Sequence, residues 1–263
     1  MNIFKQFYKS IYSPKDIASF RFQGIGKTIL YVFFLTFLSI LPSIYYLSTM
    51  LNEGIESTKS VITDDIPSFT IQNGSLSAET DVPITIEKGD FSIIVDPTGV
   101  ITNEDVEDKG NAIALLRDEF TVAAGGRIDT YSYSMMEGLT LTKADFIDIV
   151  DKVDGMKGII IPVISIFMFL VSSAINFIEV SILAWFGLLL KNLAGRSISY
   201  RHLWRIAAYS VTLPTVFFTI MSALNTPVPN SFFINWFVEI IILFLALKEI
   251  PTKNINSENE THS

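Results

Sequence analysis

Two glutamates lie inside long apolar runs of the sequence, where a carboxyl group is costly. Glu179 stands 12 residues before Lys191, which is about 18 Å along a helix. Glu239 stands nine residues before Lys248, or about 13–14 Å by the same rise. The hydrocarbon core of a bilayer is about 30 Å thick, so both carboxyls are predicted near its middle. A charge there costs at least about 2.5–3.5 kcal/mol, so both groups should face the protein interior and have partners.

Each glutamate has an asparagine on its own helix face. Asn176 precedes Glu179 by three residues, and Asn235 precedes Glu239 by four. An asparagine amide can donate a hydrogen bond to a carboxylate or to a carboxylic acid. We therefore expect one buried polar cluster between the second and fourth apolar runs, in which the two carboxyls share a proton. Its members are Asn176, Glu179, Asn235 and Glu239.

Four roles are open for this cluster. The simplest is interhelical hydrogen bonding, which is worth about 0.6–2 kcal/mol per bond inside a membrane. The second is contact with a partner membrane protein, and the third is the movement of a proton or cation. The fourth, intramembrane proteolysis, pairs two acids with a water, and no other feature of the sequence supports it. We therefore expect no catalytic residues.

The composition is typical of a membrane protein with one soluble portion. The chain has 263 residues, of which 17% are charged and 13% aromatic, and its mean hydropathy is +0.43. An average soluble domain has about 25% charged residues. There is no cysteine, which excludes disulfides, thiolate zinc sites and cysteine nucleophiles. With only two histidines, neither a metal site nor a cofactor is expected.

Apolar runs and charge asymmetry predict a topology. Basic residues cluster beside the apolar runs on one side, whereas residues 52–156 hold 21 acidic and seven basic side chains. By the positive-inside rule, both termini are cytoplasmic and residues 52–156 are extracytoplasmic. The fold class is an α-helical polytopic membrane protein with four transmembrane helices and an inserted extracytoplasmic α+β domain that is mostly β. The predicted segments are an N-terminal interfacial segment (1–24), helix one (25–51), the acidic domain (52–156), helix two (157–190), a basic cytoplasmic loop (191–205), helix three (206–224), a short outer loop (225–231), helix four (232–248) and a cytoplasmic tail (249–263).

Within the acidic domain, alternating residues around Asn73-Gly74 predict a β-hairpin. An apolar stripe that includes Phe146 and Val150 predicts an amphipathic helix leading into the next span. The acidic run at residues 104–108 lacks the spacing of a calcium loop and is interpreted as solvated. Residues 96–99 resemble a catalytic Asp-Thr-Gly only superficially, because Pro97 interrupts the motif, and they predict a turn.

Two basic segments flank the apolar runs. In the first, Phe4, Phe7, Tyr8 and Ile11 recur at helical spacing with lysines between them, which predicts an amphipathic helix in the membrane interface. The second has no acidic residue and is a candidate contact for anionic lipid headgroups, although setting the topology alone would explain it. Its basic side chains are Lys191, Arg196, Arg201 and Arg205.

The opening FYKSIYSPKDIASFRFQGIGKTILYVFFL, the segment FSIIVDPTG and the closing hairpin resemble a family of uncharacterised integral membrane proteins from Gram-positive bacteria. Some members carry the label "maltodextrin utilization protein" (YvdJ-like). A more distant likeness is to multi-span proteins of the Yip type. The resemblance spans nearly the whole chain and implies a plasma-membrane location and a link to carbohydrate uptake. No catalytic motif defines the family, so it assigns no site residues.

These observations lead to two expectations of function. The first is a non-enzymatic accessory, assembly or sensing protein of the cell membrane. The second is a small transporter component that uses Glu179 and Glu239 for proton or cation coupling. The expected partners are the lipid bilayer and either a membrane protein or a second copy of the chain, with no nucleic acid. A sealed carboxyl cluster would favour the first expectation and a wet cluster the second.

Overall fold

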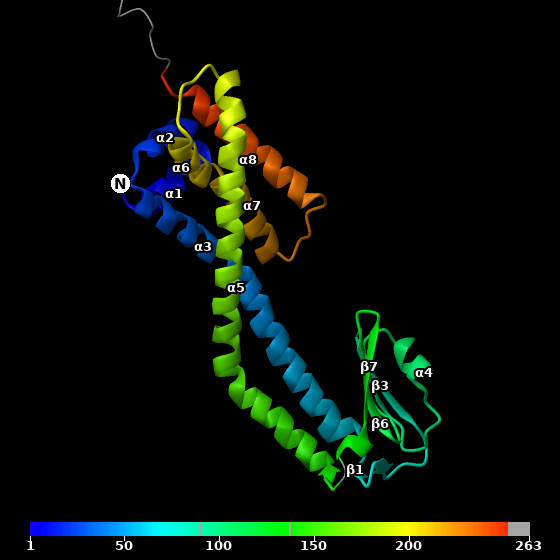
Figure 1. The fold of residues 1–263 in the computed structure, drawn as a ribbon. Coiled ribbons are helices and arrows are strands. Elements are labelled where there is room, and N and C mark those ends of the chain that lie inside the picture. Colours follow the sequence, from blue (N-terminus) through cyan, green and yellow to red (C-terminus); the bar gives the residue numbers. More distant parts are fainter. Residues whose placement is uncertain (90, 137, 252–263) are drawn as a thin grey trace, which may run out of the picture. The chain divides into compact units, whose positions relative to one another are not determined.

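The computed structural model describes residues 1–89, 91–136 and 138–251, and it divides into two compact units. The helical unit combines Met1–Leu47 with Ile161–Ser263, and the β-rich unit is Ser48–Ile160 (Figure 1). The β-rich unit lies close to the predicted 52–156. Most of the predicted tail, 249–263, lies outside the described residues.

All four predicted apolar runs are helical, and each is long and apolar enough to cross a membrane. The first is α3 (Ile25–Ser60), which continues as the π-helical turn η2 (Val61–Asp65). The second is α5 (Lys143–Leu193), a single helix of 51 residues whose first turns hold the predicted amphipathic stretch. Both helices extend well beyond the predicted spans, so each contributes residues to both units.

The third apolar run differs from the prediction. It consists of α6 (Tyr200–Ser210) and α7 (Thr212–Ala223), which meet at Val211. Pro214 is the third residue of α7, where a proline is tolerated because first-turn N–H groups lack helical partners. The predicted loop 191–205 is also wrong at both ends, since α5 runs to Leu193 and α6 begins at Tyr200. The positive charge of Arg205 led to the prediction of a loop here, but Arg205 is a buried residue of helix α6.

The N-terminal segment forms two short helices, α1 (Ile3–Tyr12) and α2 (Pro14–Ser19), followed by the 3-10 turn η1 (Phe20–Phe22). Ser13 caps α2 by accepting the N–H of Asp16. The ammonium group of Lys9 pairs with the Asp16 carboxylate, and the Ser13 hydroxyl also donates to it. Both interactions hold the pKa of Asp16 below its usual range.

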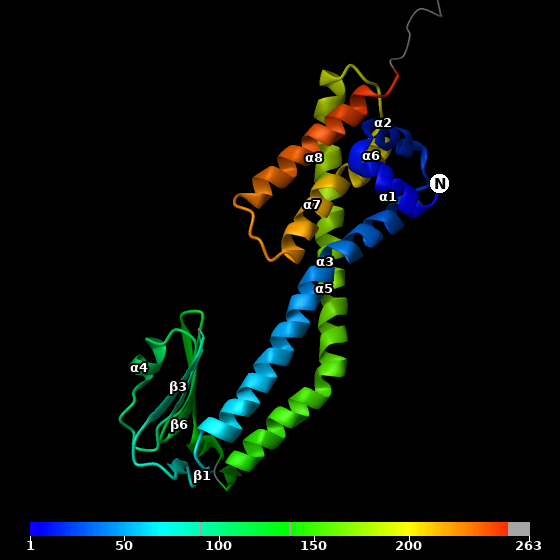
Figure 2. The ribbon, with the colours of Figure 1, turned by 180° about the vertical axis from the view of Figure 1, so that it is seen from behind.

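The core of the helical unit collects side chains from α3, α5, α6 and α8 (Ser231–Lys248), with α2 packed against it. In Figure 2, α1, α2 and α6 gather beside one end of α8, in keeping with the contacts among these helices. Gly187 of α5 allows close approach, because a Cβ there would lie 3.1 Å from Leu203 and 3.4 Å from Leu243. The bundle is thus tightest where α5, α6 and α8 meet.

The β-rich unit contains two sheets, a small antiparallel one and a larger mixed one. The small sheet has the order β2-β1-β8, and the larger has the order β3-β4-β5-β6-β7. Among the described strands of the larger sheet, only β4 and β5 pair in parallel, and α4 (Asn103–Glu107) lies in the connection between them. The strand bounds are β1 (Phe69–Gln72), β2 (Ser75–Ala78), β3 (Ile84–Lys88), β4 (Phe91–Val95), β5 (Ala112–Leu115), β6 (Glu119–Ala124), β7 (Arg127–Ser132) and β8 (Leu141–Thr142).

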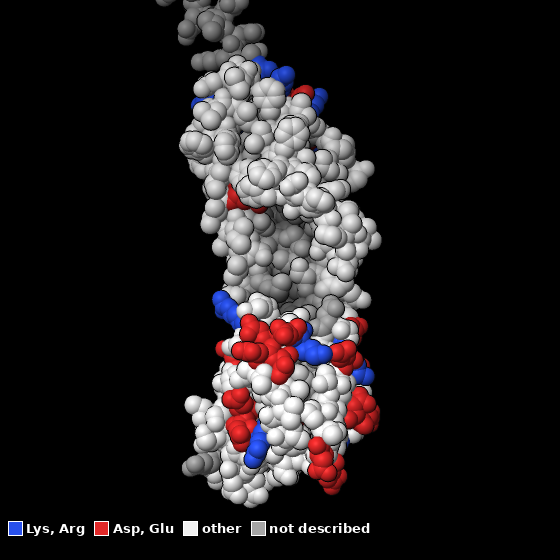
Figure 3. All heavy atoms as spheres, turned by 90° about the vertical axis from the view of Figure 1, so that its right-hand side faces the viewer, with Lys and Arg blue, Asp and Glu red and all other residues white. Residues whose placement is uncertain are grey.

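The predicted hairpin is present: β1 and β2 pair across Asn73-Gly74, whose φ values of 54° and 80° fit a type I′ turn. Alternate side chains of the larger sheet point to its opposite faces and pack into two separate hydrophobic cores. One face packs on η2, β1 and the start of α5, and the other packs on α4 through Val106. Figure 3 shows many acidic side chains over the β-rich unit, whereas the visible face of the helical unit is mostly uncharged, with basic and a few acidic groups at one end and one acidic patch along its length.

Candidate functional site

Asn235 links two carboxyl groups from different helices. Its side-chain Nδ2 donates to Glu179 Oε1 of α5 at 2.7 Å and to Glu239 Oε1 of α8 at 2.8 Å. The four-residue spacing on α8 places Asn235 and Glu239 on one face, and that face meets α5. We call these three residues the carboxyl clasp. It joins segments 56 residues apart in the sequence.

Burial makes the clasp chemically unusual. Glu239 is 1% exposed, and its Oε2 atom has no hydrogen-bond partner within the described residues. Glu179 is only partly buried. One amide cannot supply every donor that two carboxylates accept. A proton on one carboxyl would supply a donor that the site otherwise lacks.

Asn176 does not join the clasp, contrary to the prediction. Its amide donates to Thr36 Oγ1 of α3 at 2.7 Å. The three-residue spacing from Glu179 allowed a shared face, but the fully buried Thr36 offers Asn176 a partner on another helix. Asn176 thus ties α5 to α3, while Glu179 ties α5 to α8.

A second buried polar cluster was missed in the sequence. Tyr31 and Thr212 share a hydrogen bond of 2.6 Å between their hydroxyls, and the Tyr209 hydroxyl donates to Gln6 Oε1 at 3.4 Å. All four side chains are fully buried. The signal was the pair Gln6 and Ser10, polar residues one turn apart on the face of α1 opposite its aromatic stripe. That stripe is exposed, and it consists of Phe4, Tyr8 and Tyr12.

The basic residues predicted to contact lipid have mixed environments. Arg205 is 6% exposed and donates to the carbonyl of Arg21 at 2.9 Å, so it cannot reach a headgroup. Arg196 donates to the carbonyl of Lys248 at the end of α8, and Lys191 donates to that of Ile198. Cations at helix C-termini are favourable because carbonyls there lack partners. Arg201 is exposed and stays available for the predicted contact.

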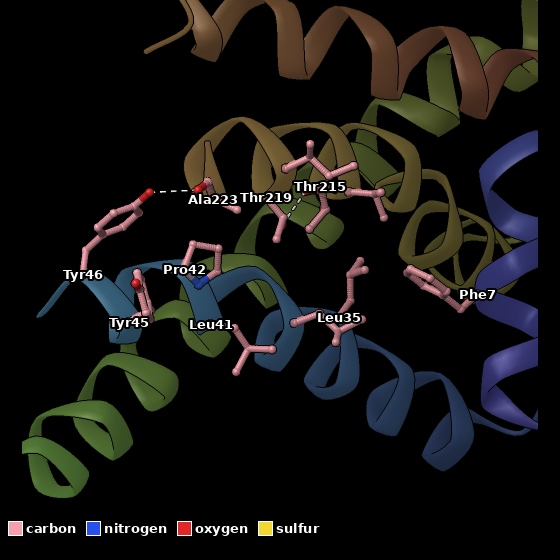
Figure 4. A pocket seen from close by; sticks show the side chains of 12 residues that line it. Phe7, Leu35, Leu41, Pro42, Tyr45, Tyr46, Thr215, Thr219 and Ala223 are labelled. Atoms are coloured by element: carbon pink, nitrogen blue, oxygen red, sulfur yellow. Dashed lines mark hydrogen bonds between the residues drawn. The ribbon is translucent and has the colours of Figure 1, made fainter. Parts of the chain in front are cut away.

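A hollow of about 440 Å³ lies between α3 and α7 (Figure 4). Leu35, Leu41 and Pro42 line it on the α3 side, and Thr215 and Thr219 on the α7 side. The hydroxyls of both threonines donate to backbone carbonyls of their own helix, so the hollow is chemically apolar. Its lining does not include the clasp, and it is not a polar path to those carboxyls.

In the β-rich unit, the stretch that resembled Asp-Thr-Gly is a turn. The fully buried Asp96 accepts hydrogen bonds from the hydroxyl and N–H of Thr98 and from the N–H groups of Gly99 and Ile101. Burial opposes its ionisation, but these four donors outweigh burial and hold the pKa of Asp96 below its usual range. Asp96 is therefore structural.

The acidic run at 104–108 is part of helix α4 and its cap. Thr102 and Asp105 form a reciprocal capping box, and the Thr102 hydroxyl and N–H lower the pKa of Asp105. In the part of the chain that the structure describes, no group of three or more His, Cys, Asp or Glu residues is placed to hold a metal ion.

Comparison with known proteins gives a family match. Residues 4–247 match the model of the family described as "Protein of unknown function (DUF1189)". No curated protein and no solved structure matches the chain. The predicted membership of an uncharacterised family is confirmed, and the family's description carries neither a membrane label nor a maltodextrin label.

Proposed function

Because the chain belongs to the DUF1189 family, whose description states no activity, we propose its role from its geometry. The protein is a non-enzymatic, multi-pass component of the cell membrane with an accessory role in sensing. Its four long apolar helices are the membrane part, with both termini in the cytoplasm. Its β-rich unit lies outside the cytoplasm and is the sensing part.

The observation that carries this proposal is the continuity of α3 and α5. Helix α3 ends in the β-rich unit and α5 begins there, and each is one continuous helix that also belongs to the helical unit. Phe146 and Val150, in the first turns of α5, pack against the core of the larger sheet. A ligand or partner that alters this packing acts directly on helices that continue into the membrane part.

The charge distribution supports the orientation. Residues 52–156 have a net charge of −14, whereas basic residues lie beside the ends of the apolar helices. The carboxyl clasp then serves as interhelical attachment that holds α5 against α8. The resemblance to proteins labelled for maltodextrin utilization makes sugar uptake the first process in which to look for the sensed signal.

In-cell crosslinking with mass spectrometry, in native membranes with and without maltodextrin, tests the sensing role. We expect a neighbouring protein whose crosslinks to the helical unit change with growth condition. Two glycines inserted after the exposed Gly155 interrupt α5 and should abolish that change while the protein stays in the membrane. The matched control inserts two glycines after Gly195, between α5 and α6. Survival of the change after the α5 insertion would contradict the proposal.

Transport is the alternative, and one observation favours it: Glu239 Oε2 lacks a donor while Glu179 remains partly exposed. Two carbodiimides separate the roles. In a sealed clasp only the membrane-soluble dicyclohexylcarbodiimide should modify Glu179, whereas in a wet clasp a water-soluble carbodiimide should modify it too. The variant Glu179→Gln with Glu239→Gln supplies the unmodified control. Modification of Glu179 by the water-soluble reagent would favour transport.

A further inference from the structure

Three arginines gather where the turn η1 meets the first turns of α6. Arg21, Arg201 and Arg205 all lie within electrostatic range of the His202 ring. The ion pairs between described residues are all made by lysines, so in that part of the chain none of these arginines pairs with a carboxylate. Like charges held close together repel one another, and an anion bound among them would offset that repulsion.

The helical unit supplies few acids that could balance this charge. Its described residues contain ten lysines and arginines but four acidic residues. Two of the four are the glutamates of the carboxyl clasp, and a third, Asp16, is paired with Lys9. The fourth, Glu249, is exposed just after α8. The positive charge at the junction of η1 and α6 is therefore left for an outside anion to neutralise.

The three arginines differ in what they present to the surface. Arg205 is 6% exposed and bonded to the backbone carbonyl of Arg21, so it contributes charge from behind. Arg21 is partly exposed, and its guanidinium is fixed by a bond of 2.6 Å to the carbonyl of Ala18 and by the Phe22 ring 4.2 Å away. Arg201 is exposed. A guanidinium is a planar fork of donors that matches the oxygens of a phosphate group.

The start of α6 adds to the same attraction. Ser199 occupies the N-cap position without capping the helix, because its hydroxyl shares a hydrogen bond of 3.0 Å with His202 Nδ1. Anions are favoured at such a helix N-terminus. Beside it, the Phe22 ring lies 6.0 Å from the His202 ring and is 71% exposed. Exposed aromatic rings next to cations are typical of the headgroup level of a membrane.

We infer that these residues bind the phosphate of an anionic phospholipid headgroup in the cytoplasmic leaflet. The arginine patch consists of Arg21, Arg201 and His202 at the surface, with Arg205 behind them. The two surface guanidiniums take the phosphate oxygens, and Phe22 lies against the apolar part of the lipid. That exposed ring favours a lipid over a free phosphate, which has no apolar part to cover it. The inference rests on the proposed membrane location and goes beyond the sensing role.

Native mass spectrometry of the full chain in detergent micelles tests the inference, because it counts bound lipids one at a time. The probes are phosphatidylglycerol, zwitterionic phosphatidylcholine and, as a soluble headgroup, glycerol 3-phosphate. We expect phosphatidylglycerol to stay bound under conditions that remove phosphatidylcholine, and glycerol 3-phosphate to leave it in place. Equal retention of the two lipids, or displacement by the soluble phosphate, would overturn the inference.

A double variant locates the lipid. Arg21→Gln with Arg201→Gln should weaken phosphatidylglycerol binding about 25-fold, because each base beside an anionic headgroup contributes about fivefold. The matched control is Lys5→Gln with Lys15→Gln, which removes the same charge from two exposed residues of the N-terminal helices. The control should bind nearly as well as the unchanged chain. Equal losses in both would show a general effect of positive charge and refute the patch.

Two further variants keep the test independent of folding. Arg201 is exposed, so Arg201→Gln should fold normally by far-UV circular dichroism and still weaken binding about fivefold. Arg201→Lys keeps the charge but removes the fork, and it should bind less tightly than the unchanged chain and more tightly than Arg201→Gln. Unchanged binding in folded Arg201→Gln would contradict the assignment. Because binding is measured on the purified chain, it can succeed even where the sensing role fails.

Discussion

Asn235 is a single donor between two carboxyl groups, so its removal breaks two hydrogen bonds at once. We predict that Asn235→Ala destabilises the bundle by about 1–2 kcal/mol, the range for buried polar bonds between membrane helices. Thermal unfolding of the detergent-solubilised chain, followed by tryptophan fluorescence, measures the loss. Asn176→Ala is the matched control, because it breaks only the bond to Thr36. A larger loss for Asn176→Ala than for Asn235→Ala would contradict the central place of the clasp.

Asp96 makes the stability of the β-rich unit depend on pH. The pKa of Asp96 is lower in the folded chain than in the unfolded chain, where it is about 3.9. Ionised Asp96 therefore stabilises the fold in full above that unfolded pKa. The stabilisation is lost as the pH falls through the folded pKa. We therefore predict that Asp96→Asn costs about 1–3 kcal/mol near neutral pH and flattens the decline below about pH 4. Hydrogen exchange of the β4 and β5 amides at several pH values measures both effects. Asp105→Asn, at the exposed cap of α4, should have the smaller effect of the two.

At the scale of elements, Gly187 sets how closely α5 approaches its neighbours. A Cβ added there would crowd Leu203 of α6 and Leu243 of α8. Gly187→Val should overpack this contact and lower stability by about 1–3 kcal/mol, measured as the unfolding temperature in detergent. Gly158→Val, on the same helix with nothing within 4 Å of a Cβ, controls for the cost of valine in α5. Equal effects would show that helix propensity, not packing, governs both.

The elements also show how far sequence patterns reach. Hydropathy located all four apolar helices, and Asn73-Gly74 located a hairpin, because both signals are local. The start of α6 was missed because the buried Arg205 is stabilised by a hydrogen bond to the carbonyl of Arg21, which only the tertiary fold brings close. In the clasp, Asn235 and Glu239 could be paired from one helix alone, whereas the partner of Asn176 depends on a contact between distant segments.

At the scale of the molecule, the proposed orientation can be read from single cysteines, because the chain has none of its own. Val100, 69% exposed in the β-rich unit, and Tyr200, 43% exposed at the start of α6, are suitable positions. Val100→Cys should react with a membrane-impermeant maleimide in intact cells. Tyr200→Cys should react only after permeabilisation. The reverse pattern would invert the topology, and labelling of both in intact cells would exclude it.

The distance in sequence between the two halves of the clasp has a consequence for biogenesis. Glu179 emerges from the ribosome 56 residues ahead of Asn235, so in the membrane topology that we propose α5 enters the bilayer before its donor exists. An unpaired carboxyl inside the bilayer is costly, so we expect α5 to stay bound to the insertion machinery until α8 has been made. A chain truncated before α8 should be degraded rapidly, as pulse-chase labelling would show, and Glu179→Gln should prolong its half-life. We then expect the protein to leave the insertion machinery only once α8 has been made.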